Sequence, residues 1–389
     1  MRKIPFAKID CNGNEMQYVR EVIESGWLTT AAKAKELEER FAAAINVKHV
    51  FAVNSCTSAL HLALDALNVK PGDKVFVPTM TFTATAEVIR YMGADPIFLD
   101  VDFSTTLLTP DIFKAAVAKN PDAKFLMVVH YAGQSVDLNP NDENSIYSIC
   151  KANNIRIVED AAHAFPAKDS GVAVGSLGDI SCFSFYANKT MTTGEGGVIA
   201  TNDDELAARI KIMRLHGINR DVWDRFTSQK SSWEYDVVAP GFKYNMPDIN
   251  AAVGLAQLER VYDMRNERQR CASFYLEKLK SFKHINLPVS RVALDDHAWH
   301  LFPITLKTTA PVSRNDLIEL LANDGIGTSV HYKPLHQMTY YKEQYKLKSP
   351  DYPNAERIWL SCLSLPIYAT LAQTDLDYIV ERLAFHLNE

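Results

Sequence analysis

The sequence predicts an α/β fold, with a large domain built on a mostly parallel central sheet that helices cover on both faces, and a small C-terminal α+β domain. Up to about residue 200, short apolar runs rich in β-branched residues alternate with segments of helical period. This alternation is typical of βαβ units, in which helices connect parallel strands. Beyond about residue 200 the alternation stops, which indicates a second structural unit.

Each predicted strand is a short apolar run, as expected where both faces of a sheet are buried. The runs occupy residues 49–53, 74–77, 96–100, 125–129 and 155–159, and the stretch 178–186 is a sixth predicted strand because its residues alternate. Helical patterns between the first five occupy residues 57–68, 83–91 and 141–153. Ligands of such sheets bind beyond the carboxyl ends of the strands, so the residues that follow each run are the candidates for chemistry.

The rest of the chain has a different pattern, with longer helices and fewer strand-like runs. We therefore predict a large domain over residues 1–245, including the N-terminal segment, and a connecting helix with a small C-terminal domain over residues 246–389. The expected elements are a helix at 203–214, a polar and aromatic stretch at 219–246, a long helix from Pro247 to about residue 280, a strand at 299–306 and helices at 313–323 and 373–387.

Composition and charge narrow the classes of function. The 389 residues are 47% hydrophobic and 23% charged, which is ordinary for a globular protein and unlike a disordered chain. Lys and Arg number 41 against 47 Asp and Glu, so the formal charge is -6. Because no basic block could follow a phosphate backbone, nucleic acid is not expected as a partner.

The cysteines and the N-terminus indicate the compartment. The six cysteines are scattered without a CxxC pair, which argues against a disulfide framework and against a structural zinc site. The N-terminus has no apolar signal segment, and no apolar run approaches the length of a membrane span. We therefore expect a cytoplasmic protein without a membrane partner.

The first candidate site is the run Asn54-Ser55-Cys56-Thr57-Ser58, which follows a predicted strand and opens a predicted helix. Hydroxyl side chains and unpaired backbone amides at a helix N-terminus favour an anion, and the helix dipole adds to this effect. The run therefore predicts a phosphate site. Simple helix capping by a serine or threonine is the alternative that this run leaves open.

The second candidate site is Glu159-Asp160-Ala161-Ala162-His163, where an apolar strand ends in two carboxylates. A buried carboxylate needs a cationic partner or hydrogen-bond donors, because burying an unpaired charge is costly. No Lys or Arg follows within the motif, so a ligand with a protonated heteroaromatic nitrogen is one candidate partner. Helix capping by Asp160 is the alternative.

The third candidate is Lys189, in the run YANKTMTTGEGG at residues 186–197. Lys189 follows the last predicted strand of the sheet and precedes a glycine turn that lets backbone approach closely. Apolar and aromatic neighbours desolvate a lysine, which lowers the pKa of its amine and makes it available for a Schiff base. A lysine in a surface turn is the alternative. An anion site, a strand-end aspartate and a lysine on one sheet are together the parts that hold pyridoxal phosphate.

Several motifs, taken in order, carry a family resemblance. They are SGWLT at 25–29, VPTMTFTAT at 77–85, EDAAHA at 159–164, the segment 178–189 with its TTGEGG tail, KYNMPD at 243–248, GIGTSVHY at 325–332 and SLP at 364–366. Over nearly the whole chain, the sequence resembles the DegT/StrS family of nucleotide-sugar aminotransferases. These are pyridoxal-phosphate enzymes with the aspartate-aminotransferase-like fold (fold type I).

The resemblance implies a role for each cofactor-binding residue. Lys189 would form a Schiff base with pyridoxal 5'-phosphate, and Asp160 would pair with the pyridinium nitrogen. Phe82 would stack on the ring, and His163 would contact the cofactor near its phenolic oxygen. The phosphate ligands would be Thr57, Ser58 and Ser184, with Asn245 supplied by a neighbouring subunit. A homodimer with shared active sites is therefore implied.

The resemblance also implies the substrates, which are L-glutamate as amino donor and a nucleotide-linked keto sugar as acceptor. Pyridoxamine phosphate would be the intermediate, and the implied context is bacterial-type surface polysaccharide or glycoconjugate biosynthesis. His331 and His336 are five residues apart, but no third ligand pattern accompanies them, so no metal is predicted. The substrate-binding residues would be Trp27, His331, Tyr332 and His336. Candidates for the nucleotide site are His216, Gly217 and the run 233–235, and ordinary packing is the alternative for each of them.

Three alternatives to this assignment concern the reaction itself. His163, where glutamine is common in relatives, and the HYKPLH segment at 331–336 favour amination at sugar carbon 4, with a 3-keto sugar as the alternative. Some relatives carry histidine in place of the lysine and are dehydratases, and Lys189 argues against that branch. The presence of Lys189 together with Asp160 also argues against a non-catalytic regulator.

The sequence departs from the family pattern in two places. Cys56 stands where glycine is frequent, so its backbone is expected to avoid a positive φ. Residues 29–32 lack the glycine and proline that usually follow the SGWLT motif. Neither departure includes the lysine.

Overall fold

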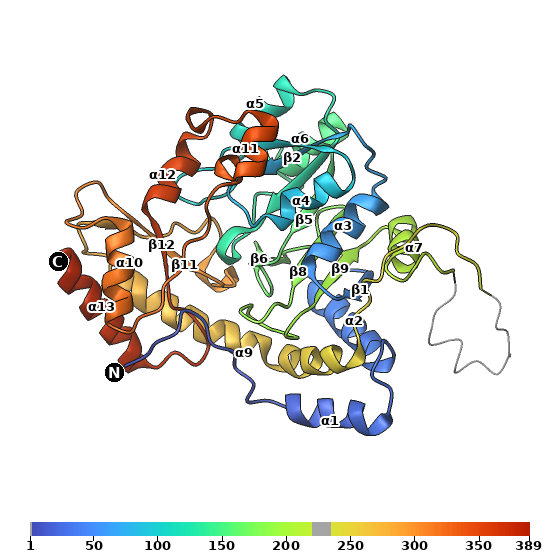
Figure 1. Ribbon diagram of the computed structural model, residues 1–389, viewed down its shortest axis with the longest axis horizontal. Coiled ribbons are helices and arrows are strands. Elements are labelled where there is room, and N and C mark those ends of the chain that lie inside the picture. The colour runs from blue at the N-terminus through green and yellow to red at the C-terminus, as the bar shows by residue number, and fades with distance from the viewer. Residues whose placement is uncertain (1, 220–234) are drawn as a thin grey trace.

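A seven-stranded sheet forms the centre of the larger part of the molecule (Figure 1). The computed structural model describes residues 2–219 and 235–389. The strands lie in the order β1, β9, β8, β5, β4, β2, β3. Their bounds are His49–Val53 (β1), Lys74–Pro78 (β2), Asp95–Leu99 (β3), Phe125–Val129 (β4), Arg156–Asp160 (β5), Ile180–Ser184 (β8) and Gly197–Thr201 (β9).

Most neighbouring strands are parallel, which confirms the predicted sheet. Strands β8, β5, β4, β2 and β3 run in one direction, whereas β9 lies antiparallel between β1 and β8. The register places Asp160 of β5 opposite Cys182 of β8. Strand β9 is absent from the predicted strands, because it directly follows the glycine turn and begins with Gly197, and glycine is depleted in strands.

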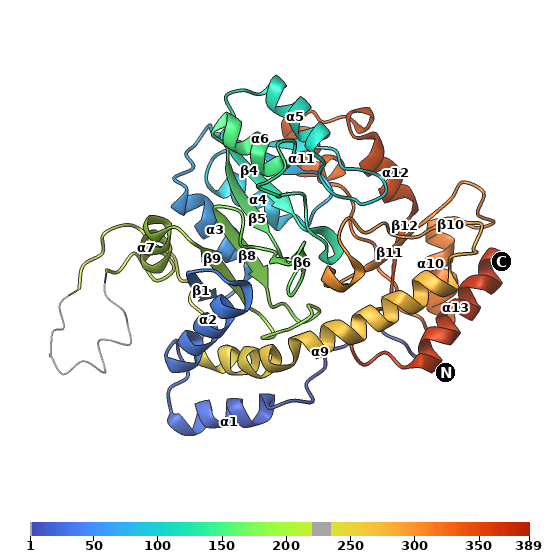
Figure 2. The ribbon, with the colours of Figure 1, turned by 180° about the vertical axis from the view of Figure 1, so that it is seen from behind.

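Helices cover both faces of the sheet (Figure 1 and Figure 2). They are α2 (Ala32–Ile45), α3 (Cys56–Ala66), α4 (Ala84–Tyr91), α5 (Pro110–Lys119), α6 (Ile146–Asn153), α7 (Asp204–Met213) and α9 (Asp248–Lys278). Val75 and Val77 of β2 pack with α3, α4 and α7, whereas Phe76 points to the opposite face and packs with α5 and α6. Near β1 and β9, that opposite face packs against α2 and α9.

Capping serines decide where two of these helices begin. Ser55 Oγ accepts from Ser58 N–H at 3.1 Å, so α3 begins at Cys56. Ser145 caps α6 in the same way, and this helix therefore begins at Ile146 and not near residue 141. The helix α1 (Glu15–Ser25) is not among the predicted elements, and of its residues only Glu15 and Val22 are buried.

The long helix α9 connects the sheet to a smaller unit at the C-terminal end of the chain (Figure 1). Leu255 packs in the core beside α2, whereas Tyr275, later in the same helix, packs in the core of the small unit. The remaining elements are the hairpin β6 (Lys168–Asp169) and β7 (Val172–Ala173), the small sheet β10 (Ile285–Asn286), β11 (Phe302–Leu306) and β12 (Cys362–Leu365), and the helices α10 (Arg314–Asn323), α11 (Thr339–Tyr345), α12 (Pro353–Ser361) and α13 (Gln373–Leu387).

Two segments pack across the boundary that the sequence predicted near residue 245. Ile4, close to the N-terminus, donates its N–H to Gly325 O at 2.8 Å and packs in the core of the small unit. In the opposite direction, Leu335 and Tyr341 pack in the core that contains α3 and α4. The two parts are therefore joined by chain segments from both ends as well as by α9. Within residues 2–219 and 235–389, no helix is both long and apolar enough to cross a membrane.

Candidate active site

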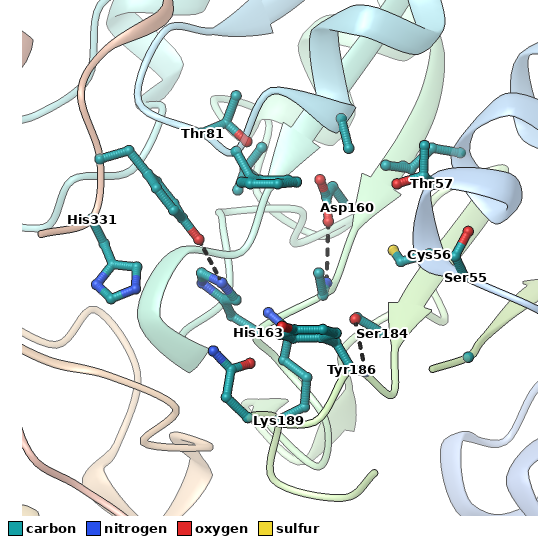
Figure 3. A pocket seen from close by; sticks show the side chains of 18 of the residues that line it. Ser55, Cys56, Thr57, Thr81, Asp160, His163, Ser184, Tyr186, Lys189 and His331 are labelled. Carbon is teal, nitrogen blue, oxygen red and sulfur yellow. Dashed lines mark hydrogen bonds between the residues drawn. The ribbon is translucent and has the colours of Figure 1, made fainter. Parts of the chain in front are cut away.

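A cavity of about 390 Å³ lies beyond the carboxyl ends of the parallel strands, where the sequence predicts chemistry (Figure 3). Its wall combines the start of α3, the segment after β2, the end of β5, the run that contains Lys189, and two residues of the small unit, His331 and Tyr332. The three candidate segments of the sequence therefore meet in one cavity. Because the small unit closes one side, the cavity lies between the two parts of the chain.

One end of this cavity is formed by the N-terminus of α3. Ser55 is the helix cap, which leaves the amides of Cys56 and Thr57 at the cavity wall without an acceptor inside the helix. Ser184, at the end of β8, also lines the cavity and accepts from Tyr186 N–H at 3.3 Å, so its own hydroxyl hydrogen can be donated to a ligand. The cap therefore leaves amides free at this end of the cavity, where the helix dipole favours an anion.

Ser58, predicted as a phosphate ligand, does not line the cavity. Its hydroxyl donates to Asn54 Oδ1 at 2.7 Å, and only 7% of the residue is exposed. The side chain is held in the cap of α3, because the helix turns it away from the end where the free amides lie. The prediction for Ser58 is therefore wrong as regards its side chain, whereas Thr57 lies at the cavity wall as predicted.

Asp160 ends β5 and is buried in the cavity wall. Its Oδ2 accepts from Thr85 Oγ1 at 2.7 Å, and its Oδ1 accepts from Ala162 N–H at 3.2 Å. Burial raises the pKa of Asp160, whereas these two hydrogen bonds and the nearby Lys189 lower it. The carboxylate has no Lys or Arg at salt-bridge distance in the described parts of the chain, so it remains available for a cationic ligand.

Lys189 follows β8 in a tight turn, and its N–H donates to Tyr186 O at 3.0 Å. Burial lowers the pKa of the Lys189 amine from 10.5 to about 8, while Cys56 and Asp160 oppose this effect. The side chain lines the cavity together with Asp160 (Figure 3). An amine with this pKa is partly neutral near neutral pH and can form a Schiff base, so the surface-turn alternative is wrong.

The glycine turn after Lys189 allows close backbone contacts, as predicted. A Cβ added at Gly197 would lie 2.5 Å from Phe183 O and 2.9 Å from Cys56 N. Only glycine therefore lets the start of β9 lie directly between β8 and the N-terminus of α3. Cys56 itself begins α3 and is not among the residues with positive φ, so its replacement of glycine introduces no backbone strain.

His163 and Tyr332 join the two parts of the chain inside the cavity. Tyr332 Oη lies 2.9 Å from His163 Nε2, and Ala132 N–H donates to His163 Nδ1 at 3.3 Å. Burial, with Lys189 and His331 nearby, lowers the pKa of His163 well below its ordinary value, so this ring is neutral. Phe82 completes this side, with its ring centroid 6.2 Å from that of Tyr332.

His331 lines the cavity from the small unit (Figure 3). Its Nδ1 lies 3.0 Å from Ser364 Oγ, and its ring stacks on Phe6 with centroids 5.5 Å apart. Burial, with Lys189 nearby, lowers the pKa of His331 to about 4, so this side chain is also neutral near neutral pH. His331 therefore lies at the cavity, and its role in binding substrate stays a prediction.

His336, predicted to bind substrate, lies outside the cavity. Its Nδ1 is 2.8 Å from Thr79 Oγ1, and its Nε2 is 2.7 Å from Glu356 Oε1. Only 1% of the residue is exposed, and both ring nitrogens are engaged. His336 is therefore a packing residue that fixes the loop before α11, and its prediction is corrected.

Asn245 and Trp27 do not line the cavity of their own chain. Asn245 Nδ2 donates to Thr30 Oγ1 at 2.6 Å, while its Oδ1 is buried and has no hydrogen-bond partner within the described residues. Trp27 follows α1, and its N–H donates to Ser25 Oγ at 3.1 Å. The predicted role of Asn245 places it in a neighbouring subunit, so its absence from this cavity leaves that prediction open.

The candidates for a nucleotide site also lie away from the cavity. His216 N–H donates to Phe242 O at 2.7 Å, and a Cβ at Gly217 would collide with Ala239 O at 1.8 Å, so both belong to a tight packing contact. Tyr235 is exposed, and residues 233 and 234 lie outside the described residues.

Two residues of the site were not singled out from the sequence. Thr85 contacts Asp160, and Asn188 lines the cavity with a buried Oδ1 that has no hydrogen-bond partner in the described chain. The hydroxyl-rich run TFTAT after β2 and the position of Asn188 next to Lys189 were the available signals.

The arrangement fits pyridoxal phosphate. The α3 terminus suits its phosphate, Asp160 its protonated ring nitrogen and Lys189 its aldehyde, and all three face one cavity. Among residues 2–219 and 235–389, no group of three His, Cys, Asp or Glu side chains is arranged to hold a metal ion.

Comparison with known proteins extends this picture. The model of the DegT/DnrJ/EryC1/StrS aminotransferase family matches residues 10–384. The chain is 40% identical over 382 residues to the spore coat polysaccharide biosynthesis protein SpsC of Bacillus subtilis, covering 97% of this chain and 95% of SpsC. The similarity to SpsC therefore extends over nearly the full length of both chains.

Solved structures agree with these relatives. Spr1654 of Streptococcus pneumoniae, assigned as a sugar aminotransferase, has been solved in PMP and PLP forms, each with a TM-score of 0.89 to this chain. The PMP form is 32% identical and covers 100% of this chain and 98% of its own. The PLP form is 31% identical and covers 100% of this chain and 99% of its own. Helicobacter pylori PseC, an aminotransferase involved in the biosynthesis of pseudoaminic acid, has a TM-score of 0.90 at 26% identity and covers 100% of both chains. The fold and the cavity described above therefore occur in a chain whose relatives carry pyridoxal phosphate.

Proposed function

Because this chain belongs to the DegT/DnrJ/EryC1/StrS aminotransferase family, we propose that it moves the amino group of L-glutamate to a keto group of a nucleotide-linked sugar. The chain is a sugar aminotransferase that uses pyridoxal phosphate. One observation carries the proposal. Lys189 and Asp160 share a cavity that has the anion site of α3 at one end and His331 and Tyr332 of the small unit at another wall.

The roles of the residues follow from this geometry. Pyridoxal phosphate, when bound, supplies an electron sink that allows the α proton of the amino donor to leave. Lys189 holds the cofactor and, once displaced, accepts that proton and later returns a proton to the sugar carbon. Asp160 would keep the ring nitrogen protonated, while the amides of α3 and the Ser184 hydroxyl would hold the phosphate. Phe82 and His163 line the same cavity and would bound the ring.

The acceptor proposed here is a 4-keto sugar. The support is His163, which replaces a glutamine common in relatives and binds Tyr332 of the small unit at 2.9 Å. His336 contributes nothing to this argument, because its ring is enclosed by Thr79 and Glu356. A 3-keto sugar is the second candidate. The test is which of the two sugars returns the cofactor to its lysine-bound form.

We also propose that two chains form a homodimer in which each completes the other's site. The support is that Phe82 and Tyr186 remain 58% and 48% exposed at the cavity. A second copy that covers these aromatic rings would supply Asn245 to the phosphate. The names of SpsC and PseC support a role in surface polysaccharide or glycoconjugate synthesis, which we place in the cytoplasm.

The donor is tested by absorbance. Protein loaded with pyridoxal phosphate should show the visible band of the lysine-bound cofactor and lose it on addition of L-glutamate. Lys189→Ala should lack the band, whereas Lys280→Ala, at an exposed position outside the cavity, should keep it. A band that survives in Lys189→Ala contradicts the assignment of the lysine, and a band unchanged by glutamate contradicts the donor.

A further inference from the structure

The contacts of His163 fix where its ring hydrogen lies. Ala132 N–H donates to Nδ1 at 3.3 Å, so Nδ1 carries a lone pair and no hydrogen. The neutral ring therefore bears its hydrogen on Nε2. This atom lies 2.9 Å from Tyr332 Oη, a contact drawn as a dashed line that reaches His163 in Figure 3. It follows that His163 donates and Tyr332 accepts.

This direction leaves the hydroxyl hydrogen of Tyr332 without a protein acceptor. Within residues 2–219 and 235–389, Tyr332 Oη makes one hydrogen bond, and its partner is His163. The side chain lines the cavity that also contains Lys189 and Asp160. Burial raises the pKa of Tyr332 far above its ordinary value, with Asp160 adding to the effect, so the phenol stays protonated. A neutral, oriented donor therefore faces the space in which substrate binds.

The surroundings of this donor make it suitable for an oxygen that gains negative charge. His163 and His331 are neutral, because burial lowers the pKa of each. The ring N–H of His163 restricts the rotation of the Tyr332 hydroxyl, so little reorganisation is needed when a ligand arrives. Tyr332 comes from the small unit and lines the same cavity as Asp160.

We propose that Tyr332 is a catalytic residue that donates a hydrogen bond to the carbonyl oxygen of the incoming keto substrate, with His163 as its positioning residue. This inference rests on the proposed function, in which the amine of the pyridoxamine form attacks that carbonyl carbon. As the carbon–nitrogen bond forms, the π bond of the carbonyl breaks and its electron pair moves to the oxygen. The hydrogen bond from Tyr332 stabilises this charge, and Tyr332 keeps its proton throughout.

Hydrogen exchange at the α carbon of glutamate separates this role from a structural one, because this exchange precedes any carbonyl chemistry. Return of the visible band requires attack on a keto group, and net amino transfer from glutamate passes through the reverse of that step. Tyr332→Phe should therefore slow the return by about 100-fold, the usual effect of removing one such donor, and slow net transfer from glutamate with it. Exchange of the α hydrogen of glutamate with solvent should stay within about threefold of the unaltered protein. Tyr147→Phe, on α6 and outside the cavity, is the matched control.

The probe for the return step is 2-oxoglutarate added to protein loaded with pyridoxamine phosphate. Equal rates of return in Tyr332→Phe and the unaltered protein, or slowing of α-hydrogen exchange by as much as the return, overturn the proposal. If 2-oxoglutarate returns the band but nucleotide-linked keto sugars do not, the sugar acceptor is wrong and the role of Tyr332 is still tested. Independently of any substrate, ¹⁵N NMR of the protein should show hydrogen on His163 Nε2, and hydrogen on Nδ1 instead overturns the proposal.

Discussion

The hydroxyl of Thr85 donates to Asp160 Oδ2 at 2.7 Å, and Thr81 Oγ1 lies 2.7 Å from Thr85 Oγ1. Thr85 has one hydrogen, which goes to the carboxylate, so Thr81 donates to Thr85 and a short chain of hydroxyls points at Asp160. This chain opposes the effect of burial, which raises the pKa of Asp160. Thr85 thus helps to keep the carboxylate charged for a protonated ring nitrogen.

Removing the Thr85 hydroxyl should therefore weaken cofactor binding. Thr85→Val keeps the shape of the side chain but removes the donor, and hydrogen bonds to charged groups contribute about 1.5–3 kcal/mol. We expect the dissociation constant of pyridoxal phosphate to rise by about tenfold or more, measured by equilibrium titration of the apoprotein. Thr85→Ser keeps the donor and should bind as the unaltered protein does. Equal affinity in Thr85→Val would show that the hydroxyl chain is dispensable.

The pKa of Lys189 predicts how cofactor capture depends on pH. The buried amine has a pKa of about 8 in place of 10.5, so it is protonated below about pH 8 and neutral above it. Because the neutral amine is the nucleophile, the rate at which apoprotein and pyridoxal phosphate form the visible band should rise with pH, with a midpoint near 8. Stopped-flow absorbance across pH 6–10 measures this, and a midpoint near 10.5 would contradict the desolvation described here.

The shared-site proposal predicts complementation between two inactive variants. If Asn245 acts in the neighbouring subunit, a mixed dimer of Asn245→Ala and Lys189→Ala contains one intact site and one site with both defects. Random exchange of subunits should restore roughly a quarter of the activity of the unaltered protein. If Asn245 acts in its own chain, each site of the mixed dimer carries one defect and activity stays near zero. The assay is aminotransferase activity after the two proteins are unfolded and refolded together.

The packing role of His336 predicts a loss of stability without a loss of substrate affinity. His336→Ala breaks buried contacts with Thr79 and Glu356 and should lower the free energy of unfolding by about 2 kcal/mol or more. Urea unfolding measures this, while KM for the keto substrate should change by less than about twofold. Gln337→Ala, which also contacts Glu356 but is more exposed, should have a smaller effect. A large rise in KM with unchanged stability would return His336 to the substrate site.

The fold was predictable where burial leaves a clear pattern. Residues 75–77 are all apolar because β2 is covered on both faces, and Lys189 and Asp160 were predicted because residues at strand ends face the same edge of a parallel sheet. Strand β9 escaped prediction because it begins with a glycine directly after a glycine turn, and the helices α1 and α2 were not predicted either. The central sheet and the anchor of the site therefore followed from sequence.

The finer structure of the site depends on side-chain direction, which residue spacing does not determine. His336 follows the motif that contains His331, yet its short turn points the ring at Thr79 and away from the cavity. Ser58 lies one residue after Thr57, but the helix turns its hydroxyl toward Asn54. The donor and acceptor roles of His163 and Tyr332 needed the position of Ala132, which is remote in sequence from Tyr332.

The central claim is that this cavity aminates a nucleotide-linked keto sugar. The most direct measurement adds UDP-, dTDP- and GDP-linked 4-keto and 3-keto sugars separately to protein loaded with pyridoxamine phosphate, and follows the visible band of the lysine-bound cofactor. We predict that at least one 4-keto sugar restores the band faster than any 3-keto sugar does. Faster restoration by a 3-keto sugar would change the position of amination, and no restoration by any sugar, while 2-oxoglutarate restores the band, would contradict the claim.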